Sequence, residues 1–504
     1  MAEYLLGLDI GSSFIKAALI EAGTGKLVAS ASSPEREMEI LAPHPGWAEQ
    51  DPAIWWWHAK RAIALLSQGA GIDTAQVEAI GISYQMHGLV LVDKEHAVLR
   101  PAIIWCDSRA VEIGNQAFAS LGEERCLRCL LNSPGNFTAS KLRWVRENEP
   151  HVYRKIHKLM LPGDYIAMRL TGEVTITASG LSEGILWDYG EDAPSTMLME
   201  NYGIVPELLP KIVPTFGVQG RVLPDVAQEL KLTPGIPVAY RAGDQPNNAF
   251  ALKVLDAGEV AAAAGTSGVV YGITDRRVYD RQSRVNGFIH VTHTQQTPRY
   301  GVLLCVNGTG ILNSWLKHNI MHLEGTGIDY ERMNAIARKA PPGSEGLLIL
   351  PYGNGAERTL GNRNIGASIH GLDFNRHRRA HVLRAAQEGI VFALNYGLEI
   401  MHSMGLEVKT VRAGHANLFL SPIFCEAFST VTGTAVELFD TDGAQGAARA
   451  AGFGAGIYKR IEDAFVGLKA IATIEPVPVL KEAYLEAYTR WRTILKNEME
   501  RNPQ

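Results

Sequence analysis

Two turns rich in glycine and hydroxyl residues are able to bind phosphate groups. The first turn, Gly11-Ser12-Ser13, joins two short apolar stretches. The second, Gly265-Thr266-Ser267-Gly268, joins two more about half a chain further on. Small residues let backbone N–H groups close around an anion, and the hydroxyls add donors. The pair predicts a duplicated fold that holds a polyphosphate from both sides.

The carboxylate of Asp244 lies about 20 residues before the second turn. It follows a predicted strand over Pro237–Tyr240, within Ala242-Gly243-Asp244-Gln245. In phosphoryl transfer, a carboxylate placed at a strand end near an anion loop orients the acceptor hydroxyl and takes its proton. The alternative is an N-cap for a helix that begins near Asn247, because aspartate is a good cap. The position alone leaves both interpretations open.

A second group of polar residues follows the end of a buried strand in the first half. It comprises the turn Gln85-Met86-His87-Gly88 and the spaced residues Trp105, Asp107 and Arg109. A carboxylate, an imidazole and a guanidinium pair with hydroxyls, while tryptophan covers the apolar face of a carbon chain. His87 alone would be interpreted as a core histidine. Together with Asp107 and Arg109 it favours a polyol-binding site.

The elements that must position these residues alternate between strands and helices. A meander is predicted over Tyr4–Ile10, Phe14–Glu21 and Leu27–Ser32. A helix follows with Asp51 as N-cap and Pro52 at its first position, and then a buried strand over Val77–Ser83. This alternation indicates an α/β layer fold.

The second part of the chain repeats this organisation after a proline-rich connection over residues 205–240. A second strand series is predicted from Val238, and a long helix over Ala380–Met401. A last amphipathic helix, Leu480–Met499, should pack on the second domain. The two hairpins place one half at residues 1–240 and the other at 241–504.

Composition limits the classes of protein. The chain has 504 residues, which favours two domains, and its net charge of −5 offers no general attraction to nucleic acid or anionic membrane. Glu3 and Asp9 interrupt the first apolar stretch, which argues against a signal peptide, and no apolar run approaches the ~20 residues that cross a bilayer. Five scattered cysteines do not form a disulfide framework, so we expect a reducing cytoplasm.

The motifs resemble the FGGY carbohydrate kinases of the actin, hexokinase and chaperone ATPase superfamily over nearly the whole chain. Asp9–Ser13 and Gly265–Gly268 resemble the two phosphate loops, and Asn136–Val145 resembles the first family signature. Ala367–Leu372, continuing to Ala385–Glu388, resembles the second. The resemblance implies two duplicated ribonuclease H-like α/β domains with a cleft, sugar-binding in 1–240 and ATP-binding in 241–504.

The resemblance also implies the roles of individual residues. Asp244 falls on the catalytic base, and Asp9 falls on a carboxylate that faces Mg²⁺ through water. The implied sugar-binding residues are Gln85, Met86, His87, Trp105, Asp107, Arg109, Asp244 and Gln245. The implied ATP-binding residues are Gly11, Ser12, Ser13, Lys16, Gly265, Thr266, Ser267, Gly310, Ser314, Ala413, Gly414 and Asn417. Pro246-Asn247-Asn248 departs from the commoner family pattern Asn-Ala-Ala-Gly.

Within the family, the turn Gln85–Gly88 is most like that of the xylulokinases, which implies ATP-dependent phosphorylation of D-xylulose at O5. Ribulose, another polyol, gluconate or glycerol remain open as acceptors, because a few cleft residues choose the acceptor. A non-enzymatic ATP-driven clamp of the actin or chaperone branch is the alternative from another class. The expected partners are a small sugar and ATP, with no nucleic acid and no membrane. Family members are often dimers, so a homodimer is a further expectation.

Overall fold

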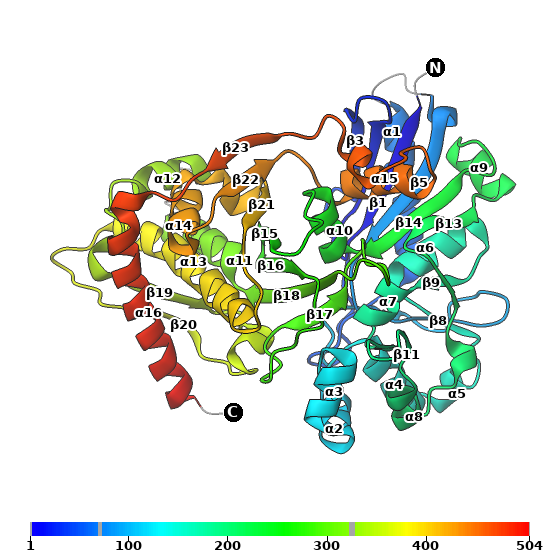
Figure 1. Cartoon of the computed structure of the whole chain (residues 1–504), viewed down its shortest axis with the longest axis horizontal. Helices are drawn as coiled ribbons and strands as arrows, with labels where there is room; N and C mark the ends of the chain where they lie inside the picture. The colour runs from blue at the N-terminus through cyan, green and yellow to red at the C-terminus, as the bar shows by residue number, and fades with distance from the viewer. Residues whose placement is uncertain (1–2, 69–72, 322–327, 503–504) are drawn as a thin grey trace. The chain divides into compact units, whose positions relative to one another are not determined.

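The computed structural model describes residues 3–68, 73–321 and 328–502, and it divides into two compact units (Figure 1). The first unit comprises Met1–Lys253, Gly287–Tyr300 and Thr441–Leu468. The second comprises Val254–Asn286, Gly301–Asp440 and Lys469–Gln504. The chain therefore leaves the first unit and returns to it twice.

A six-stranded mixed sheet forms the centre of the first unit. Its strands are β1 (Tyr4–Ile10), β2 (Ile15–Glu21), β3 (Leu27–Ser33), β5 (Val77–Tyr84), β13 (Phe216–Arg221) and β14 (Pro237–Gly243). They follow the order β13-β14-β5-β1-β2-β3, with β5 parallel to both β1 and β14. The remaining neighbours are antiparallel. The predicted three-stranded meander is confirmed, because the apolar alternation and the two short turns are local signals.

Helix α15 (Gly443–Gly454) packs against β1 and β5, although it lies more than 350 residues from both along the chain (Figure 1). Two strand glycines make the approach possible. A Cβ on Gly7 would overlap the carbonyl of Ala444, and a Cβ on Gly81 would overlap the carbonyl of Ala447. The alanines and glycines of α15 thus let its backbone lie directly on the sheet. Helix α1 (Pro52–Gln68) packs against β2 and β3.

Shorter elements complete the first unit. The helices are α2 (Val111–Leu121), α3 (Glu123–Leu130), α4 (Thr138–Asn148), α5 (Pro150–Tyr153), α6 (Pro162–Thr171), α7 (Ala178–Glu183), α8 (Thr196–Tyr202), α9 (Pro224–Leu230) and α10 (Asp244–Ala251). The strands are β4 (Glu49–Gln50), β6 (Val90–Val92), β7 (Ala102–Ile103), β8 (Lys158–Met160), β9 (Thr175–Thr177), β10 (Trp187–Asp188), β11 (Ala193–Pro194), β12 (Lys211–Val213) and β17 (Asn286–Ile289). Asp51 accepts from the N–H of Ala53, so it begins α1 as predicted.

The second unit is built on a mixed sheet of the same kind. Its strands are β15 (Glu259–Ala264), β16 (Ser267–Thr274), β18 (Tyr300–Asn307), β21 (Thr410–Gly414), β22 (Val436–Phe439) and β23 (Ala470–Ile474), in the order β18-β16-β15-β21-β22-β23. β15, β21 and β22 are mutually parallel, and β15 forms an antiparallel hairpin with β16. β19 (Leu348–Tyr352) and β20 (Gly366–His370) form a separate hairpin.

The core of the second unit surrounds one long helix, α13 (Arg379–Ser403). The other helices are α11 (Thr309–Trp315), α12 (Tyr330–Ala337), α14 (Pro422–Thr432) and α16 (Lys481–Arg501). Trp491 of α16 is fully buried, lies 6.0 Å from the Phe392 ring and donates from Nε1 to the Ile349 carbonyl over 2.9 Å. The prediction that the last helix packs on the second domain is confirmed.

Strand β14 shows where the sequence-based organisation differs from the structure. The sequence predicts a second strand series from Val238, whereas β14 pairs with β5 in the first sheet. The first segment of the first unit accordingly extends to Lys253. The reason is that β14 is buried on both sides and its apolar run carries no sign of which sheet it joins. In the residues that the structure describes, no helix is both long and apolar enough to span a membrane.

Candidate active site

Asp244 lies where a buried strand turns into a helix. β14 ends at Gly243, which is the N-cap of α10 with φ −57° and ψ 154°. Asp244 is the first residue of that helix, so it is not the N-cap that the alternative interpretation required. A negative charge in the first turn also interacts favourably with the helix dipole. The carboxylate is only partly exposed, at the carboxyl-terminal edge of the sheet.

The environment of Asp244 prepares it for proton transfer at neutral pH. Burial, and after it the negative charge of Asp9, raises the pKa of its carboxyl to about 7. A general base works best when its pKa lies near the working pH. Asp244 therefore has the protonation chemistry expected of a base.

Asp9 lies at the end of β1, on the same edge of the sheet. Burial raises the pKa of Asp9, whereas the hydrogen bond from Ser83 lowers it. The Ser83 hydroxyl on β5 donates to Oδ1 of Asp9 over 2.8 Å. Lys16 stands opposite Asp9 in the β1–β2 register and is exposed, and its charge also lowers the pKa of Asp9. Asp442, the N-cap of α15, adds a second negative charge nearby.

The first glycine-rich turn follows Asp9 directly and is held from several elements. The N–H of Gly11 donates to the carbonyl of Phe14, which closes the turn. Gln50 donates from Nε2 to the Ser12 carbonyl over 2.7 Å, and the N–H of Met38 donates to the Ser13 carbonyl over 2.9 Å. Backbone contacts thus fix the turn, while its serines stay partly exposed.

Trp105 connects the predicted sugar residues to this turn. Its indole Nε1–H donates to Oγ of Ser12 over 3.3 Å, and 43% of the residue is exposed. An exposed indole beside the phosphate turn can cover the apolar face of a bound carbon chain. The structure therefore brings Trp105 and Ser12 together.

The turn after β5 carries the other predicted sugar residues. The N–H of Gln85 donates to the Ile10 carbonyl over 2.9 Å, which ties this turn to the end of β1. Gln85 and Met86 are buried. His87 adopts the left-handed region with φ 61°, which costs energy for a residue with a Cβ. Gln245 follows Asp244 in α10 and is half-buried.

The ring of His87 is held by its neighbours. Its Nδ1 lies 2.9 Å from the backbone carbonyl of Glu183, and since a carbonyl only accepts, Nδ1 carries the proton. The ring packs edge-on against Phe137 at 4.7 Å and tilted against Phe288 at 5.4 Å. This arrangement sets both the orientation and the tautomer of the imidazole.

Asp107 and Arg109 form a buried ion pair. Arg109 donates to the Asp107 carboxylate from Nε and from Nη2, over 2.9 and 2.7 Å. The N–H of Ala48 also donates to Asp107 Oδ2 over 2.6 Å. The Asp107 side chain is completely buried, and 1% of the Arg109 side chain is exposed. The polar groups of both side chains are therefore paired within the protein, and their direct contact with a sugar stays a prediction.

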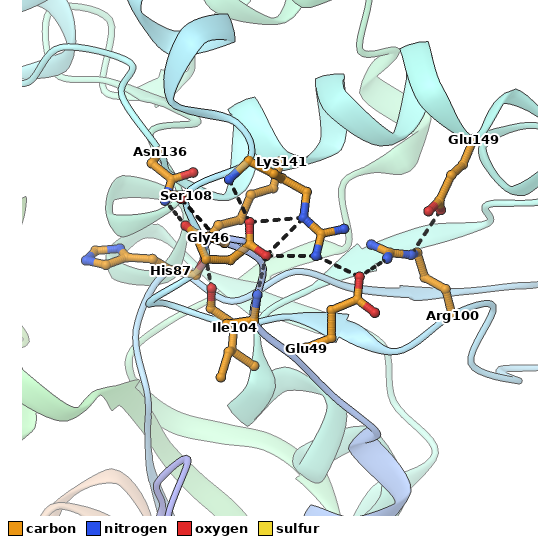
Figure 2. Close-up of polar contacts among 12 residues, drawn as sticks. Gly46, Glu49, His87, Arg100, Ile104, Ser108, Asn136, Lys141 and Glu149 are labelled. Atoms are coloured by element: carbon orange, nitrogen blue, oxygen red, sulfur yellow. Dashed lines mark hydrogen bonds and ion pairs between the residues drawn. The ribbon is translucent and has the colours of Figure 1, made fainter. Parts of the chain in front are cut away.

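The ion pair extends into the network drawn in Figure 2. Glu49 accepts from Arg109 over 2.7 Å and also pairs with Arg100, which reaches Glu149 over 3.0 Å. The Arg109 guanidinium lies 3.7 Å from the Trp47 ring centre. Stacked and doubly paired guanidinium groups are rigid, so this network holds the loop around Asp107 in place.

Lys141 of α4 joins this loop to the sugar turn. Its Nζ donates to the His87 and Ile104 carbonyls, over 2.9 Å in both cases (Figure 2). Burial lowers the pKa of Lys141 to about 7, although Asp107 opposes the shift. Asn136 donates from Nδ2 to the Asp107 carbonyl. One lysine thus fixes two separate loops of the predicted sugar site.

The second glycine-rich turn, in the second unit, is packed against the start of α11. The N–H of Gly310 donates to the Gly265 carbonyl over 2.8 Å, and the Thr309 hydroxyl donates to it over 3.0 Å. A Cβ on Gly310 would overlap that carbonyl. Thr266 is exposed, and Ser267 donates to Asn307 over 3.3 Å. The structure therefore brings the predicted nucleotide-binding residues Gly265 and Gly310 together.

The remaining predicted nucleotide residues lie near the same turn. Asn417 Nδ2 lies 3.4 Å from the position of a Cβ on Gly265. Ala413 and Gly414 end β21, whose parallel neighbour β15 leads into the Gly265 turn. Ser314 is four residues after Gly310 on α11, so the two share a helix face.

Models of two protein domains match this chain. The N-terminal domain of the FGGY family of carbohydrate kinases matches residues 4–251, and the C-terminal domain of the same family matches residues 260–455. The chain belongs to the FGGY family of carbohydrate kinases. The expected two-domain α/β fold and the ATP-dependent sugar kinase activity are confirmed. The alternative of a non-enzymatic clamp is therefore set aside.

Individual relatives of this FGGY kinase cover most of its length. It is 30% identical to the xylulose kinase of Escherichia coli K12, over 81% of this chain and 80% of the relative. A solved structure described as a "xyloylose kinase" from Brucella ovis is 27% identical, with a TM-score of 0.88 over 98% of both chains. Gluconate kinase from Lactobacillus acidophilus has the same TM-score at 22% identity over 99% of both chains, and it shows the fold alone.

Three residues of this FGGY kinase site were missed from the sequence. Ser83 could have been found, because β1 and β5 were both predicted and parallel strands end at one edge of a sheet. Lys141 lies within the first family signature, which assigns it no role, and its two carbonyl partners lie in distant loops. Glu183 stands in a stretch without a chemical pattern, so only the structure shows its position.

Proposed function

We propose that this kinase transfers the γ-phosphoryl group of ATP to O5 of D-xylulose. The observation that carries the proposal is the position of Asp244, a carboxylate with a pKa of about 7 at the sheet edge that also holds the Gln85–His87 turn. Relatives named xylulose kinase add support for the acceptor.

The sugar-binding residues of the first unit suit a short polyol. We propose that His87, with its proton on Nδ1, presents Nε2 as an acceptor to a sugar hydroxyl. The buried amide of Gln85 and the exposed indole of Trp105 offer further polar and apolar contacts. Gln245, next to Asp244, is half-buried and takes a substrate-contacting role in this proposal.

The transfer step needs a base, an acceptor and a leaving group. The Asp244 carboxylate takes the proton of the O5 hydroxyl while O5 forms its bond to the γ-phosphorus. The bond from that phosphorus to the bridging oxygen breaks, and ADP leaves. The first unit therefore supplies the base, and a neutral Asp244 cannot act in this step.

ATP is assigned to the second glycine-rich turn and its neighbours. Backbone N–H groups and the hydroxyls of Thr266 and Ser267 offer donors to phosphate oxygens. Asn417 and the end of β21 lie beside this turn and are assigned to the nucleotide. The Gly11–Ser13 turn and Lys16 are proposed as further phosphate-binding groups.

Mg²⁺ fits the residues around Asp9. Magnesium prefers oxygen ligands, keeps several waters and needs only one or two carboxylates besides phosphates. Asp9 is partly exposed, and Gly443 leaves space beside its Oδ2, where a Cβ would lie 2.7 Å from that oxygen. Asp9 would hold the ion through water, and the ion would neutralise charge on the phosphates. Among the described residues, no three His, Cys, Asp or Glu side chains gather as a metal site.

The experiment that tests this function is a panel of acceptors with ATP. ADP release is measured with D-xylulose, D-ribulose, glycerol and gluconate, and the product is identified by NMR. We expect kcat/KM for D-xylulose to exceed the others by at least about 10-fold, the scale that a few pocket contacts provide. A preference for gluconate or glycerol would overturn the acceptor but leave the kinase assignment.

A homodimer and a cytoplasmic location remain predictions from the sequence.

A further inference from the structure

Glu183 is a buried carboxyl group in the wall of the site. It is the last residue of α7, and 1% of it is exposed. The backbone N–H of His87 and the hydroxyl of Tyr84 act to lower the pKa of its carboxyl group, although neither carboxyl oxygen has a hydrogen-bond partner among the described residues. The nearby charged groups that act on it are Asp244 and Asp164, which are both acidic. Asp164 is paired with Arg241 over 2.8 Å, so that arginine already has a carboxylate partner.

The side chain of Glu183 lies between the sugar turn and the strand that leads to Asp244. A Cβ on Gly243 would overlap Oε2 of Glu183 and would lie 2.5 Å from Cγ of Met86. Gly243 immediately precedes Asp244. The backbone carbonyl of Glu183 also accepts from His87 Nδ1 over 2.9 Å. One residue thus contacts His87 and packs beside Met86 and Gly243, the residue before the proposed base.

We propose that Glu183 is a positioning residue of phosphoryl transfer, which fixes the Met86–His87 turn against the strand end that carries Asp244. This inference rests on the proposed roles of Asp244 and His87. If Glu183 has this role, sugar affinity depends on the volume of the side chain at position 183. The effects of substitutions at positions 183 and 243 on sugar affinity then depend on each other, because the two residues pack together. Neither effect follows from the base or the turn alone.

The charge of Glu183 fits this role. Burial, together with the negative charges of Asp244 and Asp164, holds the pKa of Glu183 well above its usual range. Tyr84, on β5, is the other titratable group that faces it, and burial raises the pKa of that tyrosine too. A protonated Glu183 adds no further charge beside Asp244. A glutamine of nearly the same shape should therefore replace it, whereas alanine should not.

The glycine at position 243 gives a sharp test of this packing. Its φ of −57° is open to any residue, so Gly243→Ala is opposed by the neighbouring side chains rather than by its backbone conformation. The added methyl group should displace Glu183 and Met86 and weaken sugar binding. Removing the Glu183 side chain should relieve part of that overlap. The two substitutions should then be non-additive, as expected for residues in contact.

The experiment compares Glu183→Ala, Glu183→Gln, Gly243→Ala and the Glu183→Ala/Gly243→Ala double variant. Calorimetric titration with D-xylulose in the absence of ATP gives the affinity, and steady-state assays give kcat and KM for each substrate. We expect Glu183→Ala and Gly243→Ala each to weaken D-xylulose binding about 10-fold or more, and the double variant to bind at least about 3-fold better than additivity predicts. Glu183→Gln should stay within about 3-fold of the wild type.

A matched control separates positioning from a general loss of stability. Glu388 of α13 in the second unit is also 1% exposed, and it pairs with Arg384 over 2.8 Å. Glu388→Gln should lower thermal stability without changing the D-xylulose affinity. The proposal is overturned if the losses at 183 and 243 add, if Glu183→Ala binds as the wild type does, or if Glu183→Gln is as weak as Glu183→Ala. Failure of the proposed function is seen separately, as a wild-type enzyme that binds no D-xylulose.

Discussion

The hydroxyl of Ser83 donates a hydrogen bond of 2.8 Å to Oδ1 of Asp9, across the parallel pair β5–β1. Ser83 also stands opposite Ala242 on β14, two residues before Asp244. The three parallel strand ends thus bring Asp9, Ser83 and Asp244 to one edge of a sheet. The charge of Asp9 in turn raises the pKa of Asp244. The first unit therefore couples the charge of Asp9 to the protonation of Asp244, the proposed base.

Replacement of Asp244 by asparagine should stop phosphoryl transfer and preserve sugar binding. The variant keeps the shape of the side chain but cannot accept the proton, so kcat should fall by about 10²–10⁴, the usual contribution of a general base. The ADP-release assay measures kcat, and calorimetry measures sugar affinity. Asp225→Asn is a matched control, because Asp225 also occupies the first turn of a helix in this unit and is exposed. Turnover near the wild-type rate in Asp244→Asn would remove the assignment.

The pH dependence of kcat/KM should show an acid limb near 7, the pKa of Asp244. Below this value the base is protonated, so the rate should fall about 10-fold for each pH unit. Stability should move the other way. The pKa of Asp244 in the folded protein lies above its ordinary value of 3.8. The contribution of Asp244 to the free energy of unfolding is therefore fully present below about pH 4, and it is lost as pH rises through about 7.

Thermal unfolding of the wild type and of Asp244→Asn between pH 4 and 8 measures this loss. The difference in Tm between the two proteins should shift in favour of the variant as pH rises. An acid limb near pH 4 together with a constant difference in Tm would show that the carboxyl has an ordinary pKa.

Ser83→Ala should weaken catalysis through Asp9. Loss of the donor raises the pKa of Asp9 and leaves its carboxylate with one hydrogen bond fewer. A hydrogen bond to a charged group contributes about 1.5–3 kcal/mol, so kcat/KM for ATP should fall about 10-fold to 100-fold. Ser83→Thr should restore most of the activity. Ser195→Ala is the control, because Ser195 is equally buried but caps α8, and its loss should cost about 1 kcal/mol of stability without a kinetic effect.

Gly310→Ala should raise KM for ATP and leave the sugar affinity unchanged. The added methyl group would overlap the Gly265 carbonyl and displace the second glycine-rich turn. Shifts of this size in a positioning element cost about 10²-fold. Gly23→Ala is the control, since a Cβ there meets no atom within 4 Å. An unchanged KM for ATP in Gly310→Ala would separate this turn from nucleotide binding.

Lys141→Met should weaken sugar binding, because it leaves the His87 and Ile104 carbonyls without their shared donor. Each buried acceptor left unsatisfied costs about 1–3 kcal/mol of stability. Lys158→Met is a close control, because Lys158 also donates to two carbonyls, those of Glu207 and Leu209. Chemical denaturation measures stability, and calorimetry with D-xylulose measures affinity. Equal losses of affinity in both variants would show that Lys141 has no special role in the sugar turn.

Local patterns predicted the elements that carry the site. The β1–β2 hairpin, the α1 cap at Asp51 and the last helix follow from alternation, capping and periodicity within short segments. The family resemblance assigned Gly265 and Gly310 to the same nucleotide site. The structure shows the backbone hydrogen bond that joins them.

Contacts between distant segments could not be predicted in this way. The sequence suggested that Asp107 and Arg109 face a sugar, but it does not show that Glu49 and Ala48 occupy their polar atoms. Likewise, nothing in the run of alanines after Gly443 indicates that it packs on β1 rather than on a neighbouring strand of the second sheet. Such pairings depend on how the whole chain folds.

The packing of α15 on Gly7 and Gly81 has a consequence for synthesis on the ribosome. The central strands of the first unit emerge early, but the helix that covers them is translated only after residue 443. Translation proceeds at about 5–20 residues per second, so the sheet stays uncovered for tens of seconds before α15 has been synthesised. A nascent chain stopped before α15 should therefore expose an apolar sheet face and depend on chaperones, whereas chains that extend beyond Leu468 contain every segment of the first unit.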